Sequence, residues 1–433
     1  MHFLSQILPA VVAAFIGQAA ALPLIVHPGT ANDIVITKNN TINGTDRAIP
    51  IAPQATEQLQ FSFVNNLNGG AVNAYVTGLD DNNQLVMLQP DGTWYYPTAD
   101  TSGVPQPITG NVAIPLGGQG STTQITLPSY ISSGRVWFAE GTLQFFTVQG
   151  ASGPSLVEPS AVNPSDPSAA VNWGFVELTN NSGGLFANIS YVDFVGLVLG
   201  MILNTASGAT QSAQGLQPGA VASICSDLAS RASQDGQPWD QLCVKDTSGT
   251  PLRVLAPSDY ISINPNAFSG YYSDYTNQVW STYSTSTLTI DTQAGAGEVA
   301  CTVTDGTLNC AGDNRGYAMP NEGDIFGCNS GPFAIIAGDN DVHAAVVPRL
   351  CAAFDRTTLL LPGGNVQPSL DSSNYYTTDP TNWYSATVHK YEIDGKGYAF
   401  SYDDVNPAGE NQSGVVSDAD PTLLTITIGG PSS

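Results

Sequence analysis

Positively charged residues are scarce in this chain. Its 433 residues include 11 Lys and Arg against 36 Asp and Glu, which gives a formal net charge of −25. A surface of this charge repels nucleic acid and anionic membranes, so we expect neither as a partner. It suits a neutral substrate, and a solvated acidic surface accounts for most of the carboxylates.

Histidine is also scarce, and the common nucleophile motifs are missing. The sequence contains no CxxC pair, no HExxH motif, no GxSxG elbow and no phosphate-binding GxxxxGK loop. The four histidines are scattered, at His2, His27, His343 and His389. These absences argue against a zinc site and against a Ser-His-Asp triad, so we expect no metal and no cofactor.

No apolar run is long enough to cross a membrane as a stable helix. The first residues carry an apolar stretch from Ile7 to Ile16 and end in Ala19-Ala20-Ala21, a pattern typical of a signal peptidase site. The run from Phe194 to Leu203 is shorter still and indicates a buried strand or helix. We predict a signal peptide over residues 1–21 and a secreted, extracellular protein.

Cysteines and glycosylation motifs agree with export. All six cysteines lie between Cys225 and Cys351, and an even number in an exported chain indicates disulfides. Six cysteines allow fifteen pairings. Short-range closure favours Cys225–Cys243, Cys301–Cys310 and Cys328–Cys351. Sequons that could carry glycans occur at Asn39, Asn43, Asn180, Asn188 and Asn411, although a sequon in a buried strand cannot be used.

The hydrophobic pattern predicts a mainly β fold with a mixed insertion. Short alternating or apolar segments separated by Gly, Pro and Asn turns are typical of an antiparallel barrel or sandwich. Spacing of three and four indicates helices at 218–232, 266–283 and 343–356. Strand-like patterns return at 357–362, 391–404 and near the C-terminus. We predict one β domain from 22–204 and 361–433, and an inserted mixed α/β domain over 205–360.

Carboxylate chemistry fits this composition best, and two acids stand out. Glu177 and Asp193 each interrupt an apolar, strand-like run, where a charge is costly unless it is paired or functional. Glycoside hydrolysis needs two carboxyls that flank the scissile bond, one of them kept protonated by apolar neighbours. Neighbouring apolar residues at 175, 176 and 178 could raise the pKa of Glu177 in this way.

The register of the strands decides whether this pair can work. A tight hairpin centred on Ser182-Gly183 would separate the two acids by about 20 Å along the strands. The hypothesis therefore requires a longer, bent loop. Other acids compete for the role: Glu140, Glu158, Asp403 and Asp404.

A family resemblance favours the pair. The segments WGFVELTNN and FANISYVDFVGLVLG, with KGYAFSYDDVNP near the C-terminus, resemble motifs of glycoside hydrolase family 64, the thaumatin-like β-1,3-glucanases. The resemblance extends from about Leu59 to Gly430. It implies a thaumatin-like antiparallel β-barrel or sandwich and a mixed α/β domain that flank a wide groove.

The resemblance also implies roles for individual residues. Glu177 matches the general acid and Asp193 the general base of an inverting endo-type β-1,3-glucanase that releases short oligosaccharides. Thr179 and Asn181 match sugar-binding positions, and Phe186 could line the groove or pack in the core. The expected partner is β-1,3-glucan of the kind found in laminarin and fungal cell walls, bound by a monomer. The alternative is a thaumatin-like protein that binds β-glucan without cutting it.

Overall fold

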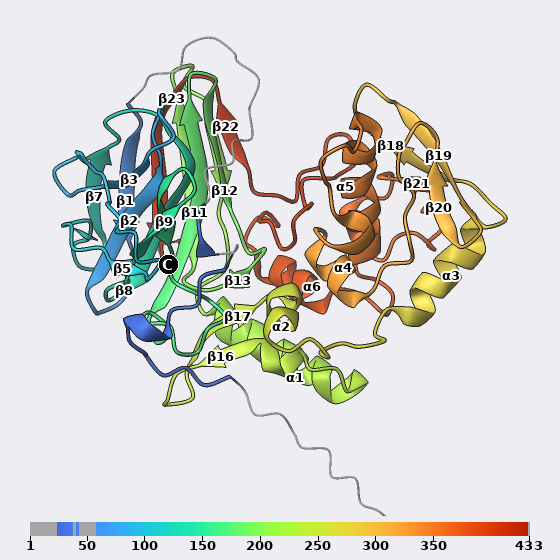
Figure 1. The fold of residues 1–433 in the computed structure, drawn as a ribbon, viewed down its shortest axis with the longest axis horizontal. Helices are drawn as coiled ribbons and strands as arrows, with labels where there is room; N and C mark the ends of the chain where they lie inside the picture. The colour runs from blue at the N-terminus through green and yellow to red at the C-terminus, as the bar shows by residue number, and fades with distance from the viewer. Residues whose placement is uncertain (1–23, 38–39, 43–57, 432–433) are drawn as a thin grey trace, which may run out of the picture.

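The structure, a computed structural model, describes residues 24–37, 40–42 and 58–431 (Figure 1). The predicted signal peptide and the sequons at Asn39 and Asn43 lie outside the described residues. The structure is mainly β, as predicted. Strand-rich and helix-containing parts occupy opposite sides of the molecule in Figure 1.

The strand-rich part contains two large sheets. The order of the first sheet is β15-β14-β23-β1-β7. Its strands are β15 (Thr210–Ala213), β14 (Leu199–Thr205), β23 (Pro421–Ile428), β1 (Gln60–Asn65) and β7 (Ser121–Thr126). The central pair, β1 and β23, is parallel, so the N-terminal and C-terminal strands of the domain lie side by side.

The second sheet carries the residues of interest. Its order is β22-β12-β11-β8-β2-β3-β4, with β6 paired to β2. Its strands are β22 (Val416–Asp418), β12 (Gly184–Ile189), β11 (Asn172–Asn181), β8 (Ile131–Glu140), β2 (Val72–Leu79), β3 (Leu85–Leu88), β4 (Trp94–Tyr95) and β6 (Ile114–Pro115). A small sheet, β10 (Gly153–Val157), β9 (Phe146–Gly150) and β5 (Gln106–Pro107), lies beside it.

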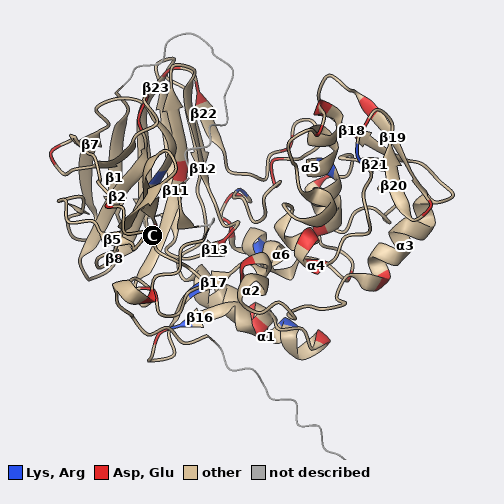
Figure 2. Cartoon of the chain, viewed as in Figure 1, with Lys and Arg blue, Asp and Glu red and all other residues tan. Residues whose placement is uncertain are grey.

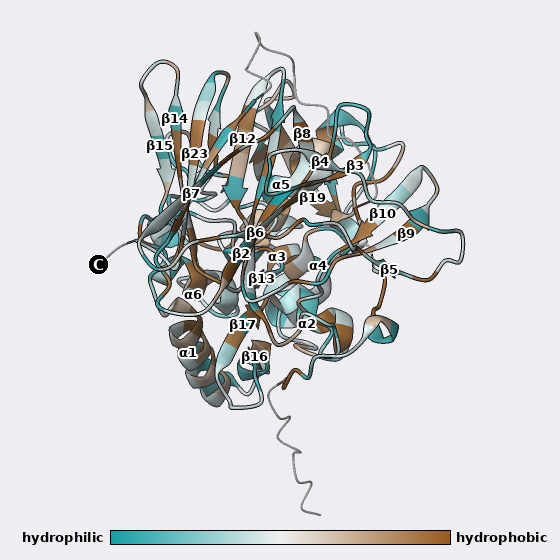
Figure 3. Cartoon of the chain, turned by 90° about the vertical axis from the view of Figure 1, so that its left-hand side faces the viewer, coloured by the Kyte–Doolittle hydropathy of each residue, from teal (hydrophilic) through white to brown (hydrophobic). Residues whose placement is uncertain are grey.

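One apolar core joins the two large sheets. Phe63 of β1 meets Phe138 of β8 edge to face, with ring centroids 5.1 Å apart. Hydrophobic and hydrophilic bands alternate along strands such as β14 and β23 (Figure 3), as expected for strands that present one face to the core. The arrangement is a sandwich of two sheets.

Helices and short strands make up the other part. The helices are α1 (Ala220–Asp235), α2 (Pro257–Ile263), α3 (Ser273–Tyr283), α4 (Glu322–Gly327), α5 (Asp341–Asp355) and α6 (Trp383–Tyr391). Two small sheets accompany them: β13 (Phe194–Val195), β17 (Pro251–Leu255) and β16 (Cys243–Lys245), and β20 (Thr307–Cys310), β19 (Glu298–Thr304), β18 (Leu288–Asp291) and β21 (Val366–Gln367). No helix among the described residues is long and apolar enough to span a membrane.

All three predicted disulfides are confirmed. The cysteines pair as Cys225–Cys243, Cys301–Cys310 and Cys328–Cys351. The first joins α1 to β16, the second closes the β19–β20 hairpin, and the third joins α4 to α5. Each bridge closes a short loop in the helix-containing part, where it restricts the unfolded chain.

Two strand predictions are wrong. Residues 357–362 form turns, and residues 391–404 form the end of α6, isolated bridges at Glu392 and Tyr398, and turns. At the end of the second segment, the buried guanidinium of Arg356 donates to the main-chain carbonyls of Asp403 and Val405. These carbonyls are thereby satisfied without a strand partner.

The strand pairing also shows where the chain crosses between the two parts. It leaves the five-stranded sheet after Ala213 at the end of β15, and returns to the sandwich at Val416 at the start of β22. Between these points, β21 pairs with β18 in the helix-containing part. The division into domains at residues 204 and 361 stays a prediction.

Candidate active site

Strand β11 presents the motif residues on one face. Its even-numbered residues from 174 to 180 are buried in the core, whereas Glu177, Thr179 and Asn181 are partly exposed. Side chains two residues apart point to the same face of a strand. Trp173 and Phe175 precede them on that face. Along this face of β11, two aromatic side chains are therefore followed by the three polar ones.

Neighbouring strands add to this face at the level of Glu177. Arg135 of β8 lies opposite Glu177 on one side, and Asn188 of β12 lies opposite it on the other. Thr77 of β2 lies opposite Arg135. Directly opposed residues of adjacent strands share a face, so these four side chains form one row across the sheet.

A β-bulge lies immediately beyond this row. The pairing of β8 shifts register between Leu178 and Asn180 on one side and between Thr77 and Leu79 on the other. Ser133 of β8 has a φ of +48°, in the left-handed region. Bulges of this kind bend a strand and redirect its side chains, and they are common next to active sites. Here the bulge ends the regular pleat beside Glu177 and Thr179.

The β11–β12 hairpin is tight, so the prediction of a longer, bent loop is wrong. Asn181 pairs with Gly184, so only Ser182 and Gly183 form the turn. Gly184 has a φ of +116°, and a Cβ there would lie 2.2 Å from the carbonyl oxygen of Asp418 on the neighbouring strand. A side chain at this position would prevent β22 from pairing with the hairpin.

A bend after β12 brings Asp193 back toward Glu177. The last pair of the hairpin is Val176 with Ile189, and the chain then leaves the sheet. The Leu197 amide donates to the Trp173 carbonyl at 2.9 Å, which returns the chain to the start of β11. The carbonyl of Asp193 accepts from the Ala256 amide at 2.8 Å, which anchors it to the entry of α2. The bend after β12, and not a longer hairpin loop, brings Asp193 back toward the strand that carries Glu177.

Arg135 is the cation of the site. Its Nη1 donates to Glu158 Oε2 at 2.6 Å, and its Nη2 and Nε donate to Glu177 Oε1 at 3.1 and 3.3 Å. Its Cζ lies 4.5 Å from the centroid of the Phe175 ring. The guanidinium therefore bridges two acids while an aromatic face covers its plane.

The environments of the three acids differ. Glu158 is buried, and among the described residues its Oε1 has no hydrogen-bond partner. Glu177 keeps 33% of its side chain exposed and so can reach a ligand. Asp193, like Glu177, is partly exposed, so Glu158 is the buried member of the three.

Burial and charge shift the pKa values in this cluster. Burial raises the pKa of Asp193; the Arg135 charge opposes this rise, and the Glu177 charge adds to it. Burial likewise raises the pKa of Glu158 against the opposing effect of Arg135. The pKa of Arg135 is raised, because the charges of Glu158, Glu177 and Asp193 outweigh the effect of its own burial. The guanidinium is thus permanently charged, and the acids share its field.

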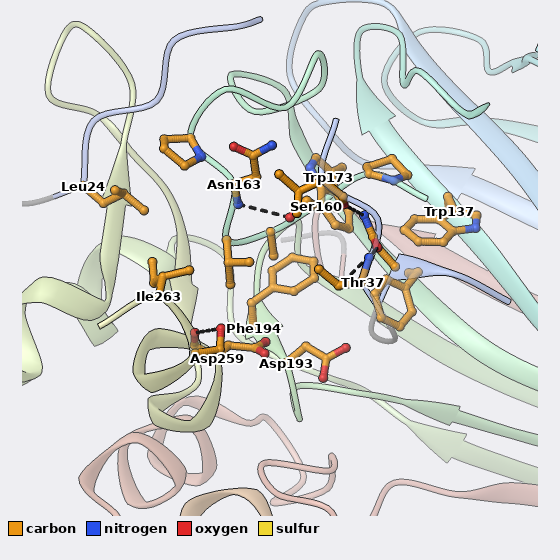
Figure 4. Close-up of a pocket in the computed structure, with 18 of the residues that line it drawn as sticks. Leu24, Thr37, Trp137, Ser160, Asn163, Trp173, Asp193, Phe194, Asp259 and Ile263 are labelled. Atoms are coloured by element: carbon orange, nitrogen blue, oxygen red, sulfur yellow. Dashed lines mark hydrogen bonds between the residues drawn. The ribbon is translucent and has the colours of Figure 1, made fainter. Parts of the chain in front are cut away.

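A cavity of about 620 Å³ lies on the Asp193 side of the cluster (Figure 4). Arg135 and Asp193 line it together with aromatic side chains and a rim of polar ones. Its aromatic residues are Trp137, Trp173, Phe175 and Phe194. A pocket with apolar walls, a few polar groups and an acid of raised pKa is suited to binding and reacting with a neutral polyol.

The remaining predicted site residues fall on the same surface. Phe186 of β12 lies directly opposite Thr179, and 37% of it is exposed. Of the two alternatives for Phe186, its placement therefore favours lining the surface over packing in the core. Asn181 accepts a hydrogen bond from the Gly183 amide at 2.8 Å, which holds its side chain at the end of the hairpin.

The competing acids are placed elsewhere, apart from Glu158. Glu140 is exposed and accepts from the side chain of Asn172. Asp403 is buried between Arg356 and His389 in the helix-containing part. No group of three or more His, Cys, Asp or Glu in the described part of the chain is arranged to hold a metal ion.

Arg135 was not predicted from the sequence. The available signal was its rarity, because it is one of 11 basic residues and stands directly before the apolar run VWFA. Lys and Arg are few and widely spaced over the whole molecule (Figure 2). In so acidic a chain, a cation beside an apolar run indicates a buried cluster of carboxylates.

Comparisons with known proteins agree on one family. The family model described as β-1,3-glucanase matches residues 57–428. The glucan endo-1,3-β-glucosidases of Cellulosimicrobium cellulans and of Arthrobacter sp. (strain YCWD3) are each 28% identical over 302 residues, which cover 68% of this chain and 52% of the relative. The chain thus spans about half the length of these curated relatives.

Solved structures share the fold. A laminaripentaose-producing β-1,3-glucanase in complex with laminaritetraose is 26% identical, with a TM-score of 0.75, over 86% of this chain and 99% of that one. A β-1,3-glucanase domain from Clostridium beijerinckii is 21% identical, with a TM-score of 0.67, over 87% of this chain and 99% of that one. The second likeness supports the fold alone.

Replacing the central cation should destabilise the protein. Arg135→Met leaves the buried Glu158 without its partner, and we expect a loss of about 3–5 kcal/mol in the free energy of unfolding, measured by urea denaturation. Lys390→Met is the control, because Lys390 is 59% exposed in its pair with Asp227. It should cost no more than about 1 kcal/mol.

A double variant distinguishes the cost of leaving Glu158 charged and unpaired from the cost of losing the packing of the Arg135 side chain. Arg135→Met with Glu158→Gln removes the unpaired charge and should recover part of the loss. If the urea midpoint of Arg135→Met equals that of the wild type, the stability of the cluster does not depend on this cation.

Proposed function

The chain belongs to glycoside hydrolase family 64, the β-1,3-glucanases, and on that premise we propose that it hydrolyses β-1,3-glucan to short oligosaccharides with Glu177 and Asp193 as its acid and base. One observation carries the assignment. The bend after β12 returns Asp193 to the Arg135 cluster, so the charges of Asp193 and Glu177 act on each other and on the same cation.

Glu177 is suited to protonate the glycosidic oxygen. It stands on a rigid strand, its side chain is partly exposed, and Arg135 donates to one of its oxygens. Those hydrogen bonds are to Oε1 alone, which leaves Oε2 to carry the proton toward a ligand. A carboxyl held in this manner has a defined direction for proton transfer.

Asp193 is suited to activate water. Its carboxyl lines the cavity, and its raised pKa makes it a stronger base than an ordinary aspartate once it is ionised. In a single displacement, Asp193 takes a proton from the water that attacks the anomeric carbon, while Glu177 protonates the leaving oxygen on the opposite side. The bond to water forms as the glycosidic bond breaks, and the anomeric configuration inverts.

Thr179, Asn181 and Phe186 would hold the sugar. All three lie on the face that carries Glu177, and together they offer a hydroxyl, an amide and an exposed ring. Sugars bind through hydroxyl hydrogen bonds and through stacking of their apolar faces on aromatic rings. The set extends the binding surface from Glu177 toward the hairpin end.

We further propose a secreted monomer with a thaumatin-like sandwich that acts on β-1,3-glucan, including fungal cell-wall glucan. The signal-peptide pattern and the three disulfides support secretion. Asn411 is exposed and is the best glycosylation candidate among the described sequons, whereas Asn180 and Asn188 are buried in strands.

Removing the acid should abolish cleavage. For Glu177→Gln we expect a loss of 10²–10⁴-fold in kcat on soluble β-1,3-glucan, because a positioned general acid contributes about this factor. Product chromatography measures the loss. Asp193→Asn should lose activity similarly, whereas Glu140→Gln, which alters an exposed acid on the same sheet, should keep wild-type activity.

Other outcomes have distinct meanings. A folded Glu177→Gln enzyme with wild-type activity would move the acid to another residue, with Glu158 next to be tested. Wild-type protein that binds β-1,3-glucan and never cuts it would be a non-catalytic glucan-binding protein.

The raised pKa of Asp193 predicts the acid side of the pH profile. Asp193 must be ionised to act as base, so kcat/KM should fall as the pH drops through its raised pKa. The midpoint should lie above about 3.9, the ordinary value for aspartate, and belongs to the interacting pair as a whole.

Initial rates across pH measure this midpoint, and circular dichroism at each pH separates titration from acid unfolding. The assignment of Asp193 would be contradicted if the enzyme stays folded and the midpoint of its kcat/KM profile lies at or below the ordinary pKa of aspartate.

A further inference from the structure

A segment that precedes the family match contributes to the cavity. The match begins at residue 57, yet the structure also describes residues 24–37 and 40–42. We refer to these described residues as the N-terminal strap. The strap therefore lies outside the part of this chain that the family model matches.

Main-chain hydrogen bonds fix the strap at both ends. At its start, the Val26 amide donates to the Lys245 carbonyl of β16 at 3.1 Å, and the Lys245 amide donates to the Leu24 carbonyl at 3.0 Å. At its end, the Glu158 amide donates to the Asn40 carbonyl at 2.8 Å. The strap thus runs from the helix-containing part to the residue that forms an ion pair with Arg135.

Asn40 shapes the stretch between these anchors. Its Oδ1 accepts from the amide and the hydroxyl of Thr37 at 2.7 and 2.8 Å, and its Nδ2 donates to the Val35 carbonyl at 2.9 Å. Asn40 itself is buried. A buried amide with three such bonds holds the chain in one conformation, so Val35 and Thr37 are presented in defined positions.

The strap forms a wall of the cavity that contains Asp193. Leu24, Val35, Thr37 and Asn40 all line this cavity. Figure 4 shows Leu24 at the upper left, Thr37 on the right and Asp193 at the lower edge of the pocket. A ligand that reacts at Asp193 and fills the cavity must therefore touch the strap.

The lining indicates what the cavity binds. Its four aromatic side chains are at most 6% exposed and back the cavity, while Val35 and Ile263 present exposed apolar side chains. Thr37, Ser160, Asn163 and Asp259 add polar groups to the lining. Apolar side chains combined with hydroxyl, amide and carboxylate groups are what a pyranose ring requires, because its faces are apolar and its edge carries hydroxyls. A volume of about 620 Å³ is in the range of small-molecule sites.

We propose that the N-terminal strap is a specificity element, the outer wall of a subsite that binds an additional glucosyl unit of the substrate on the Asp193 side. This inference rests on the proposed glucanase function. Contact with the strap lets binding energy from a remote sugar unit contribute to kcat/KM, so longer chains should be better substrates than short ones.

A bulky side chain on the strap tests the inference. Val35 lines the cavity and is 56% exposed, so Val35→Trp should fill the subsite without disturbing the core. The adjacent Ile36 is 44% exposed and does not line the cavity, which makes Ile36→Trp a control of equal size. Thr37→Trp is a second cavity-filling variant, should Val35→Trp fold poorly.

The readout is kcat/KM on linear β-1,3-gluco-oligosaccharides of increasing length. In wild type and in Ile36→Trp, kcat/KM should rise with each added unit until the subsites are filled. In Val35→Trp the rise should stop at least one unit earlier, with a loss of about tenfold on the longest oligosaccharides and little change on the shortest.

The outcomes separate this inference from the function on which it rests. A wild-type enzyme that cuts the whole series, with Val35→Trp and Thr37→Trp indistinguishable from Ile36→Trp at every length, would overturn the role of the strap and leave the glucanase function intact. A folded wild-type protein that cuts no member of the series would overturn both.

Discussion

The ion pairs of Arg135 are the interaction on which the rest of the site depends. In a chain with 36 acidic and 11 basic residues, three carboxylates meet at one cation whose own plane rests on Phe175. The buried Glu158 forms an ion pair with the guanidinium and so holds it in place. The guanidinium in turn forms an ion pair with the partly exposed Glu177. Without this cation, mutual repulsion and burial would force the acids to take up protons or move apart.

The site also requires Asp193 to lie near Glu177, and the path of the backbone achieves this. The tight hairpin alone would carry Asp193 away from Glu177, since Glu177 lies opposite Asn188. The bend after Ile189, held by the bond between Leu197 and Trp173, reverses that separation. Glu177 therefore stands on a strand and Asp193 on a bend anchored to α2, so the two acids approach the cation from different elements.

Much of this could be predicted from the sequence, and the failures have physical causes. The disulfides follow from short loop closure, and Glu177 and Asp193 could be chosen as candidates because charges interrupt apolar strands. Register was not predictable, since the decisive contact between Leu197 and Trp173 joins residues with no shared local pattern. The strand predicted at 391–404 was wrong because this segment makes only isolated bridges, at Glu392 and Tyr398, and the carbonyl of Asp403 accepts from the distant Arg356. Arg135 was missed because a partner on an adjacent strand leaves no trace in local spacing.

The stereochemistry of the first product tests the pairing of Glu177 with Asp193 most directly. Proton NMR of fresh β-1,3-glucan hydrolysate, recorded before mutarotation, reports the anomer released at the new reducing end. Single displacement by water on Asp193 gives the α-anomer first, with the β-anomer growing in later. Initial release of the β-anomer would mean retention through a covalent intermediate, and would contradict the acid and base roles assigned to this pair.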